Sequence, residues 1–233
     1  MNYLELCQRV ARRAGVSGSH AVKPDSVINQ TGRMALVCDY VAEASREIET
    51  TWNDYTFMRR EVDFSISANT QSYDPGALQS DIERINVTSL TVRDENSRNP
   101  LTPVSWAEQY RTQRVVNIDT SDMLPTAYSI DSAGIIHFLP VSSREFVLRA
   151  EVILRAKELR NNTDVPHIPE DYRYCIVHKA RMMYYEEDEA WQLYEASERR
   201  YREWMDRLED KFLPANSHGR TQTTESPMIM VTE

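Results

Sequence analysis

The spacing of apolar residues divides the chain into a helical start, a strand-rich middle and a helical end. Apolar residues recur every three or four positions over Leu4–Ala14, and Gly15 then predicts a helix end. A second stripe with this spacing runs over Met34–Tyr55. It predicts a longer helix that begins near Thr31, a residue type suited to an N-cap.

From Glu61 the period changes to two, because apolar and polar residues alternate over Val62–Ser67. Turn-forming sequences separate further strand candidates, which are Ile85–Val92, Ala127–Ile130, Ile135–Leu139 and Phe146–Leu154. The sequence DSAG predicts a hairpin between the second and third of these. The pattern favours a small antiparallel sheet or sandwich.

The last part predicts an antiparallel helix pair. Pro169 suits a first helical turn, and neither Gly nor Pro follows until Pro214. The acidic run Glu186–Ala190 is the expected turn, which gives helices at about 169–185 and 189–213. The inner face of the second helix is expected to carry Leu193, Ala196, Ser197, Trp204 and Leu208.

The second helix of this pair also carries three Glu–Arg pairs at i,i+4 spacing, in the order that stabilises a helix. They indicate a solvated outer face that could pack against copies of itself, with possible inter-subunit contacts at Glu195, Glu198, Arg199, Arg202, Glu203 and Arg207.

Together these patterns predict an α+β fold. Two N-terminal helices and the C-terminal antiparallel helix pair form a helical bundle, into which a small antiparallel β domain is inserted, and an extended C-terminal tail follows. The expected divisions are N-terminal helices at 1–60, a β-rich domain at 61–160, the helix pair at 161–213 and a flexible docking tail at 214–233.

The tail has a polar spacer followed by apolar residues, a composition typical of a flexible segment whose tip binds in a groove. Strand addition to an exposed sheet edge of a partner would suit this tip. Its residues are Ser226, Pro227, Met228, Ile229, Met230 and Val231. A tip folded back on its own domain and a disordered tip are the alternatives.

Composition narrows the function classes. The formal charge of −9 argues against a protein that grips nucleic acid by its phosphates. No apolar run approaches the roughly 20 residues that span a bilayer, and the N-terminus does not read as a secretory signal. Cys7, Cys38 and Cys175 are expected to be buried free thiols in a reducing cytoplasm.

Candidate chemistry is sparse. Asp171, Cys175 and His178 fall on one helix face, where they could bind a metal or pair a thiol with a base, although a buried core and an edge histidine explain the same pattern. The chain has no Gly-rich phosphate loop and no nucleophile elbow. Arginine pairs such as Arg12–Arg13 and Arg199–Arg200 suit DNA or an acidic partner, but most such pairs are surface charge. We expect no enzyme, cofactor or metal site.

The sequence resembles the head-to-tail adaptor proteins of tailed bacteriophages. The resemblance lies in the opening MNYLELCQRVARRAGVSG, the helix end IETTWNDYTFMRRE, the strand-like region and the closing helix pair that begins YRYCIVHKARMMYYEEDEAW. These are diffuse patterns of apolar and aromatic positions over most of the chain.

The resemblance implies a structural virion protein in the phage neck, made in the host cytoplasm. Such adaptors form a ring, typically of twelve copies, below the portal protein, and an extended C-terminal segment commonly docks on the portal. The ring continues the DNA channel, with DNA only as passing cargo, and supports later tail or neck proteins. Neither catalysis nor a membrane is implied. A neighbouring tail-completion or tail-terminator ring protein is the alternative, and a metal-dependent enzyme at Asp171, Cys175 and His178 is a remote one.

Overall fold

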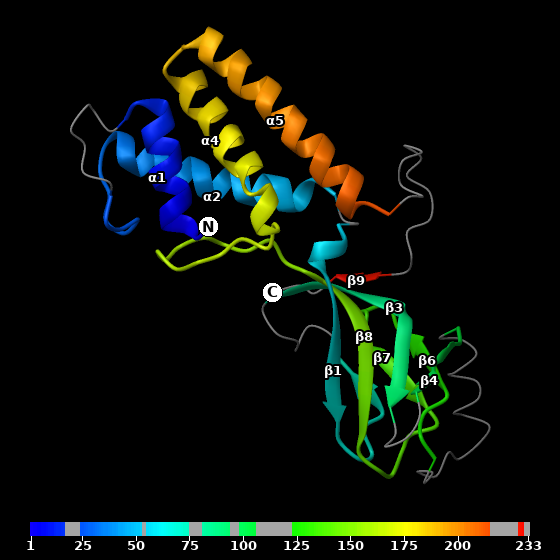
Figure 1. Ribbon diagram of the computed structural model, residues 1–233. Helices are drawn as coiled ribbons and strands as arrows, with labels where there is room; N and C mark the ends of the chain where they lie inside the picture. The colour runs from blue at the N-terminus through cyan, green and yellow to red at the C-terminus, as the bar shows by residue number, and fades with distance from the viewer. Residues whose placement is uncertain are drawn as a thin grey trace. The chain divides into compact units, whose positions relative to one another are not determined.

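A computed structural model describes residues 1–16, 24–52, 55–74, 81–93, 98–105, 123–214 and 228–230. Within these residues the protein is α+β, with four α-helices and two small sheets (Figure 1). The chain forms two compact units. The helical unit contains Met1–Met58 and Ala156–Arg220, and the β unit contains Arg59–Arg155 and Thr221–Glu233.

The helices of the helical unit lie close to where the apolar spacing predicts them. They are α1 (Tyr3–Ala14), α2 (Arg33–Thr51), α4 (Tyr174–Glu187) and α5 (Trp191–Phe212), with short 3-10 turns η1 (Thr56–Met58) and η3 (Glu170–Tyr172). A capping box between Asn2 and Glu5 begins α1, and Gly15 ends it with a left-handed φ of 71°. The predicted end of this helix at Gly15 is therefore confirmed.

One predicted N-cap and one predicted helix start are wrong, although α2 begins near Thr31 as expected. The N-cap of α2 is Gly32 rather than Thr31, and no side chain caps this end. Pro169 precedes η3 rather than an α-helix, and α4 begins only at Tyr174. A 3-10 turn closes its hydrogen bonds over three residues instead of four. A short run of helix-forming residues can therefore adopt it just before an α-helix begins.

The central helix of this unit is α4, which packs against α1, α2 and α5. It is buried on several sides, and its buried residues include Cys175, Ile176, Val177 and Ala180. By contrast, α5 buries one face, at Ser197, Met205 and Leu208.

The predicted inner face of α5 is partly wrong. Leu193 is 49% exposed and Ala196 is also exposed, whereas Ser197 and Leu208 are buried. Adjacent residues of a helix point about 100° apart, so Ala196 falls outside the buried stripe that Ser197, Met205 and Leu208 mark.

The β unit contains two sheets. Their strands are β1 (Arg59–Ile66), β2 (Ser72–Tyr73), β3 (Ile82–Arg93), β4 (Arg98–Pro100), β5 (Thr102–Pro103), β6 (Ala127–Ile130), β7 (Ile136–Leu139), β8 (Phe146–Leu154) and β9 (Met228–Met230). The first sheet has the order β1-β8-β3-β4, with β9 also on β3, and the second has the order β2-β7-β6-β5.

Backbone pairing is antiparallel at every described pair of strands except one. The predicted hairpin is confirmed, since β6 pairs antiparallel with β7 across the DSAG turn. The exception is the short β5, which pairs parallel with β6. Apolar side chains such as Phe138 and Phe146, whose ring centroids are 5.4 Å apart, form the core of this unit.

Candidate assembly interface

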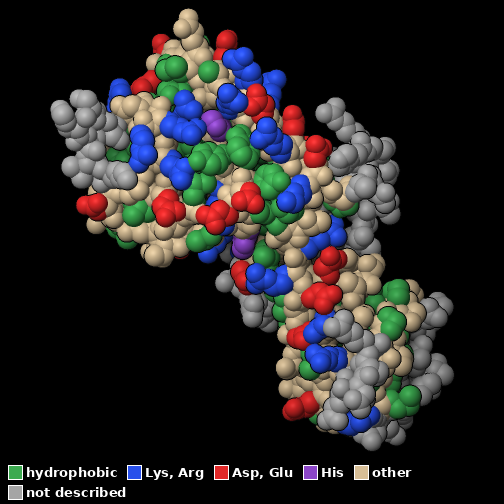
Figure 2. Space-filling view, viewed as in Figure 1, with side chains coloured by type: hydrophobic (Ala, Val, Ile, Leu, Met, Phe, Trp, Pro, Cys, Tyr) green, Lys and Arg blue, Asp and Glu red, His purple; other side chains and the backbone are tan. Residues whose placement is uncertain are grey.

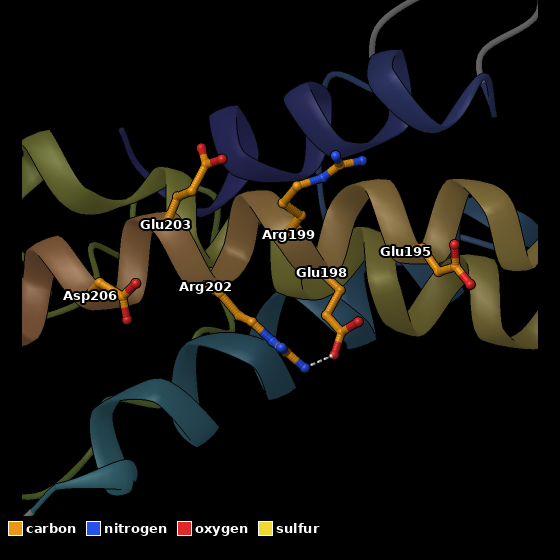
Figure 3. Close-up of a pocket in the computed structure, with 6 residues that line it drawn as sticks. All are labelled: Glu195, Glu198, Arg199, Arg202, Glu203 and Asp206. Carbon is orange, nitrogen blue, oxygen red and sulfur yellow. Dashed lines mark hydrogen bonds and ion pairs between the residues drawn. The ribbon is translucent and has the colours of Figure 1, made fainter.

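The outer face of α5 is the first candidate contact surface, and it carries charged side chains along most of its length. A shallow hollow of about 270 Å³ is lined by Glu195, Glu198, Arg199, Arg202, Glu203 and Asp206 (Figure 3). Side chains of both signs line it, with four acids against two arginines, so its lining has an excess of negative charge. Such a surface is suited to contact with another charged surface, with the ion pairs setting the register.

Only one of the three predicted i,i+4 ion pairs on α5 is present. Arg202 donates to Glu198 at 2.6 Å. Glu203 instead pairs with Arg200, at 3.0 Å, and the Arg207 guanidinium lies 5.3 Å from the Trp204 ring centroid. Within the described part of the chain, no ion pair joins Glu195 to Arg199. Exposed pairs of this kind are weak, so other nearby partners compete with the helical spacing.

The C-terminal tip is the second candidate surface. Met228–Met230 forms β9, which pairs antiparallel with β3 of the same chain over Arg84–Asn86. In the isolated chain the tip is therefore folded back on its own domain, which is one of the two alternatives to docking on a partner. Docking of the tip on a partner belongs to an assembled state and stays a prediction, and Ser226, Pro227 and Val231 lie outside the described residues.

β9 pairs with the part of the β3 edge that lies before a bulge in that strand. The register of β3 against β8 shifts between Asn86 and Thr91. At this bulge the Ser89 hydroxyl accepts a hydrogen bond from the Glu151 amide, at 2.8 Å, in place of the backbone ladder. β4 pairs with β3 beyond the bulge and β9 pairs before it, so the tip covers a separate stretch of edge.

The three residues considered as a possible active site lie in different environments. Cys175 is fully buried, and burial raises the pKa of its thiol to about 12, which opposes thiolate chemistry. His178 is also buried, and its pKa is lowered to about 4 by burial and then by nearby arginines. Asp171 lies exposed in η3. Among the residues that the structure describes, no group of three His, Cys, Asp or Glu side chains could hold a metal ion.

The acceptor edge on β3 is the feature that sequence reasoning misses. Arg84, Ile85 and Asn86 read as an ordinary strand, and which edge stays open depends on how distant strands pair. The available signal for a bulge is the pair of consecutive polar residues Thr88 and Ser89, which interrupts the alternation of apolar and polar residues in this strand.

No helix within the described residues is long and apolar enough to cross a membrane. In comparison with known protein families, the model of one family, described as SU10 adaptor protein, matches residues 1–229. No curated protein matches the sequence.

Proposed function

This chain belongs to the SU10 adaptor protein family, a family of phage structural adaptors, and we propose that it forms a dodecameric ring below the portal in the neck of a tailed phage. The ring extends the DNA channel and is the platform on which tail or neck proteins assemble. The family match over nearly the whole chain is the observation that carries this proposal. A neighbouring ring component, such as a tail-completion or tail-terminator protein, is the alternative.

The charge of the chain supports a channel rather than a DNA-gripping role. Each copy has a formal charge of −9, and a ring multiplies this charge. A channel wall of like charge repels DNA phosphates, so that DNA passes without being held. The charged outer face of α5, with its Glu198–Arg202 pair, is suited to contact a neighbouring copy along the ring.

The C-terminal tip supports attachment to the portal. We infer that β9 leaves β3 when the protein docks, and that the apolar tip then adds to an exposed strand edge of the portal. Among the described residues, Met228–Met230 pair with β3, and this short contact can be exchanged for a longer one. Methionines at positions 228 and 230 adapt to an imperfect groove.

The test is to mix the purified protein with DNA-filled heads that carry the portal and to image the portal vertex by electron microscopy. We expect a ring of adaptor below the portal. Replacing residues 226–233 with a Gly/Ser segment of equal length is expected to abolish attachment, whereas the same replacement at residues 218–225 is the matched control and should not. A protein that never binds the vertex contradicts the proposed function, and undiminished attachment without the tip contradicts only the docking role.

A further inference from the structure

Positive side chains gather on one side of the helical unit, although the chain as a whole is acidic. Figure 2 shows Lys and Arg side chains clustered around a histidine over α1, α4 and α5. The arginine face, as we call this surface, comprises Arg9 and Arg13 of α1, Arg181 of α4 and Arg200 of α5, around His178.

Most of the positive charge on the arginine face is not neutralised. The guanidinium groups of Arg9 and Arg13 lie 5.2 and 5.3 Å from the ring centroid of Tyr174, and that of Arg181 lies 5.4 Å from the ring of Tyr185. Tyrosine rings attract a cation but leave its charge in place. Among the described residues, Glu203 is the one carboxylate that pairs with the arginine face, and its Oε2 atom lies 3.0 Å from Nη1 of Arg200.

The arginine face is also held in position before any partner arrives. The Tyr174 hydroxyl accepts a hydrogen bond from Arg9, and its ring stacks on Trp204 at 5.5 Å. On the other side, Arg181 donates to the Tyr185 hydroxyl at 3.2 Å, which in turn donates to the Arg13 carbonyl. Side chains that are already ordered lose less entropy on binding, so this arrangement favours a protein contact.

An acidic surface lies on α2 of the same unit. Asp39 and Glu43 are exposed one turn apart on α2, and neither has an ion pair with a described residue, although Arg46 follows them. α2 packs against both α1 and α4, and its Glu47 pairs with Lys179 of α4 at 2.7 Å.

We propose that the arginine face of one copy binds the acidic side of α2 on the next copy, at Asp39 and Glu43. This inference rests on the proposed ring. Two different but complementary surfaces of one unit make a head-to-tail contact, the type that closes a cyclic ring. DNA is a poorer occupant, because the net charge of −9 repels phosphates at long range.

The test uses two charge-reversed variants of the full chain on portal-bearing heads. The first carries Arg9→Glu with Arg13→Glu, and the second carries Asp39→Arg with Glu43→Arg. We expect each variant alone to lose ring formation at least tenfold, because its two contact surfaces then have the same charge. An equal mixture is expected to restore rings, because alternating copies again present opposite charges. Circular dichroism checks that both variants are folded.

The exposed Arg160, which pairs with Glu158 instead of a tyrosine, provides the control. Arg160→Glu changes charge on the same unit and should leave rings unchanged. The proposal is overturned if either variant alone forms rings as well as the wild type, or if the mixture forms none. The proposal is also overturned, in favour of a nucleic-acid site, if the wild type retains duplex DNA and the first variant loses this DNA binding while its rings stay intact. If the wild type forms no ring on the heads, the proposed function itself fails.

Discussion

Segments that are far apart in the sequence are joined mainly by backbone hydrogen bonds in the β unit and mainly by side chains in the helical unit. Among the described residues of the helical unit, the exceptions are the first amides of α1, since those of Tyr3 and Leu4 donate to the carbonyls of Asp164 and Asn162. β1 and β8 pair residue by residue from Arg59–Ile153 to Ile66–Phe146. A helix satisfies its own backbone groups internally, so α2 can hold a distant segment only through its side chains. Glu49 does this by accepting hydrogen bonds from the amides of Lys157, at 2.9 Å, and His167, at 2.7 Å.

This difference shows where a single side chain matters most. In the β unit, Arg149 binds Asp63 across the β1–β8 pair, with one contact at 2.6 Å, but the ladder beneath holds the strands without it. In the helical unit, Glu49 is 3% exposed and two amides depend on it. The side chains that connect the helices therefore carry the structural role that backbone bonds carry in the sheet.

The largest expected effect is that of Glu49→Ala. Two part-buried amides lose their acceptor, and an unsatisfied buried group costs about 1–3 kcal/mol, so we expect the free energy of unfolding to fall by about 3 kcal/mol. Chemical denaturation followed by far-ultraviolet circular dichroism measures this change. Glu43→Ala, at an exposed position of the same helix, is the matched control and should change little.

Asp63→Ala extends this test to the β unit. Because the β1–β8 ladder remains, its effect should be clearly smaller than that of Glu49→Ala. An equal or larger loss of stability at Asp63 would contradict the comparison between the two units.

The next effect is a pH dependence with two opposing parts, both in the helical unit. Burial raises the pKa of Glu49 to about 7, so the fold favours its protonated form. The stabilisation that Glu49 gives the fold is complete below pH 4.5, which is the ordinary pKa of a glutamate, and is lost as the pH rises through 7. Burial, and then the nearby Arg181, Arg13 and Arg200, lowers the pKa of His178 to about 4. The contribution of His178 to the stability of the fold is therefore present above pH 6.5 and is lost as the pH falls through 4.

Two single variants separate these parts. Relative to the wild type, Glu49→Gln should gain stability as the pH rises from 5 to 7, and His178→Gln should lose it over the same range. Each relative change is expected to be about 1–2 kcal/mol. The measurement is the free energy of unfolding against pH for the three proteins, and parallel curves would show that neither group titrates as inferred.

Local patterns predict the elements of this protein better than their connections. The period-two alternation and the DSAG turn are properties of neighbouring residues, so β6, β7 and β8 lie where expected. The start of α4 was misplaced, because a proline and two acids suit a 3-10 turn as well as an α-helix. The role of Glu49 could not be foreseen, because its partners are backbone amides more than a hundred residues away.

The candidate surfaces show the same limit. The charged outer face of α5 follows from helical spacing, yet Glu203 binds Arg200 instead of Arg207 because local geometry selects among weak exposed partners. The arginine face was visible only as Arg12–Arg13 and Arg199–Arg200 in the sequence. Packing of α1 and α5 beside α4 brings Arg13, Arg181 and Arg200 together, and no pattern within one helix contains that information.

The smallest effect concerns two buried tyrosines of the helical unit that differ in one hydrogen bond. The Tyr3 hydroxyl donates to the Cys38 carbonyl at 2.9 Å, and so connects α1 to α2. The Tyr55 hydroxyl is fully buried and, among the described residues, has no partner. We expect Tyr3→Phe to lower the free energy of unfolding by about 1 kcal/mol and Tyr55→Phe to leave it unchanged or raise it by up to about 1 kcal/mol, because the second change removes only an unpaired polar group. The two variants differ from the wild type by the same single oxygen atom, so denaturation curves compare them directly. Equal destabilisation by both would contradict the role given to the Tyr3 hydrogen bond between the two helices.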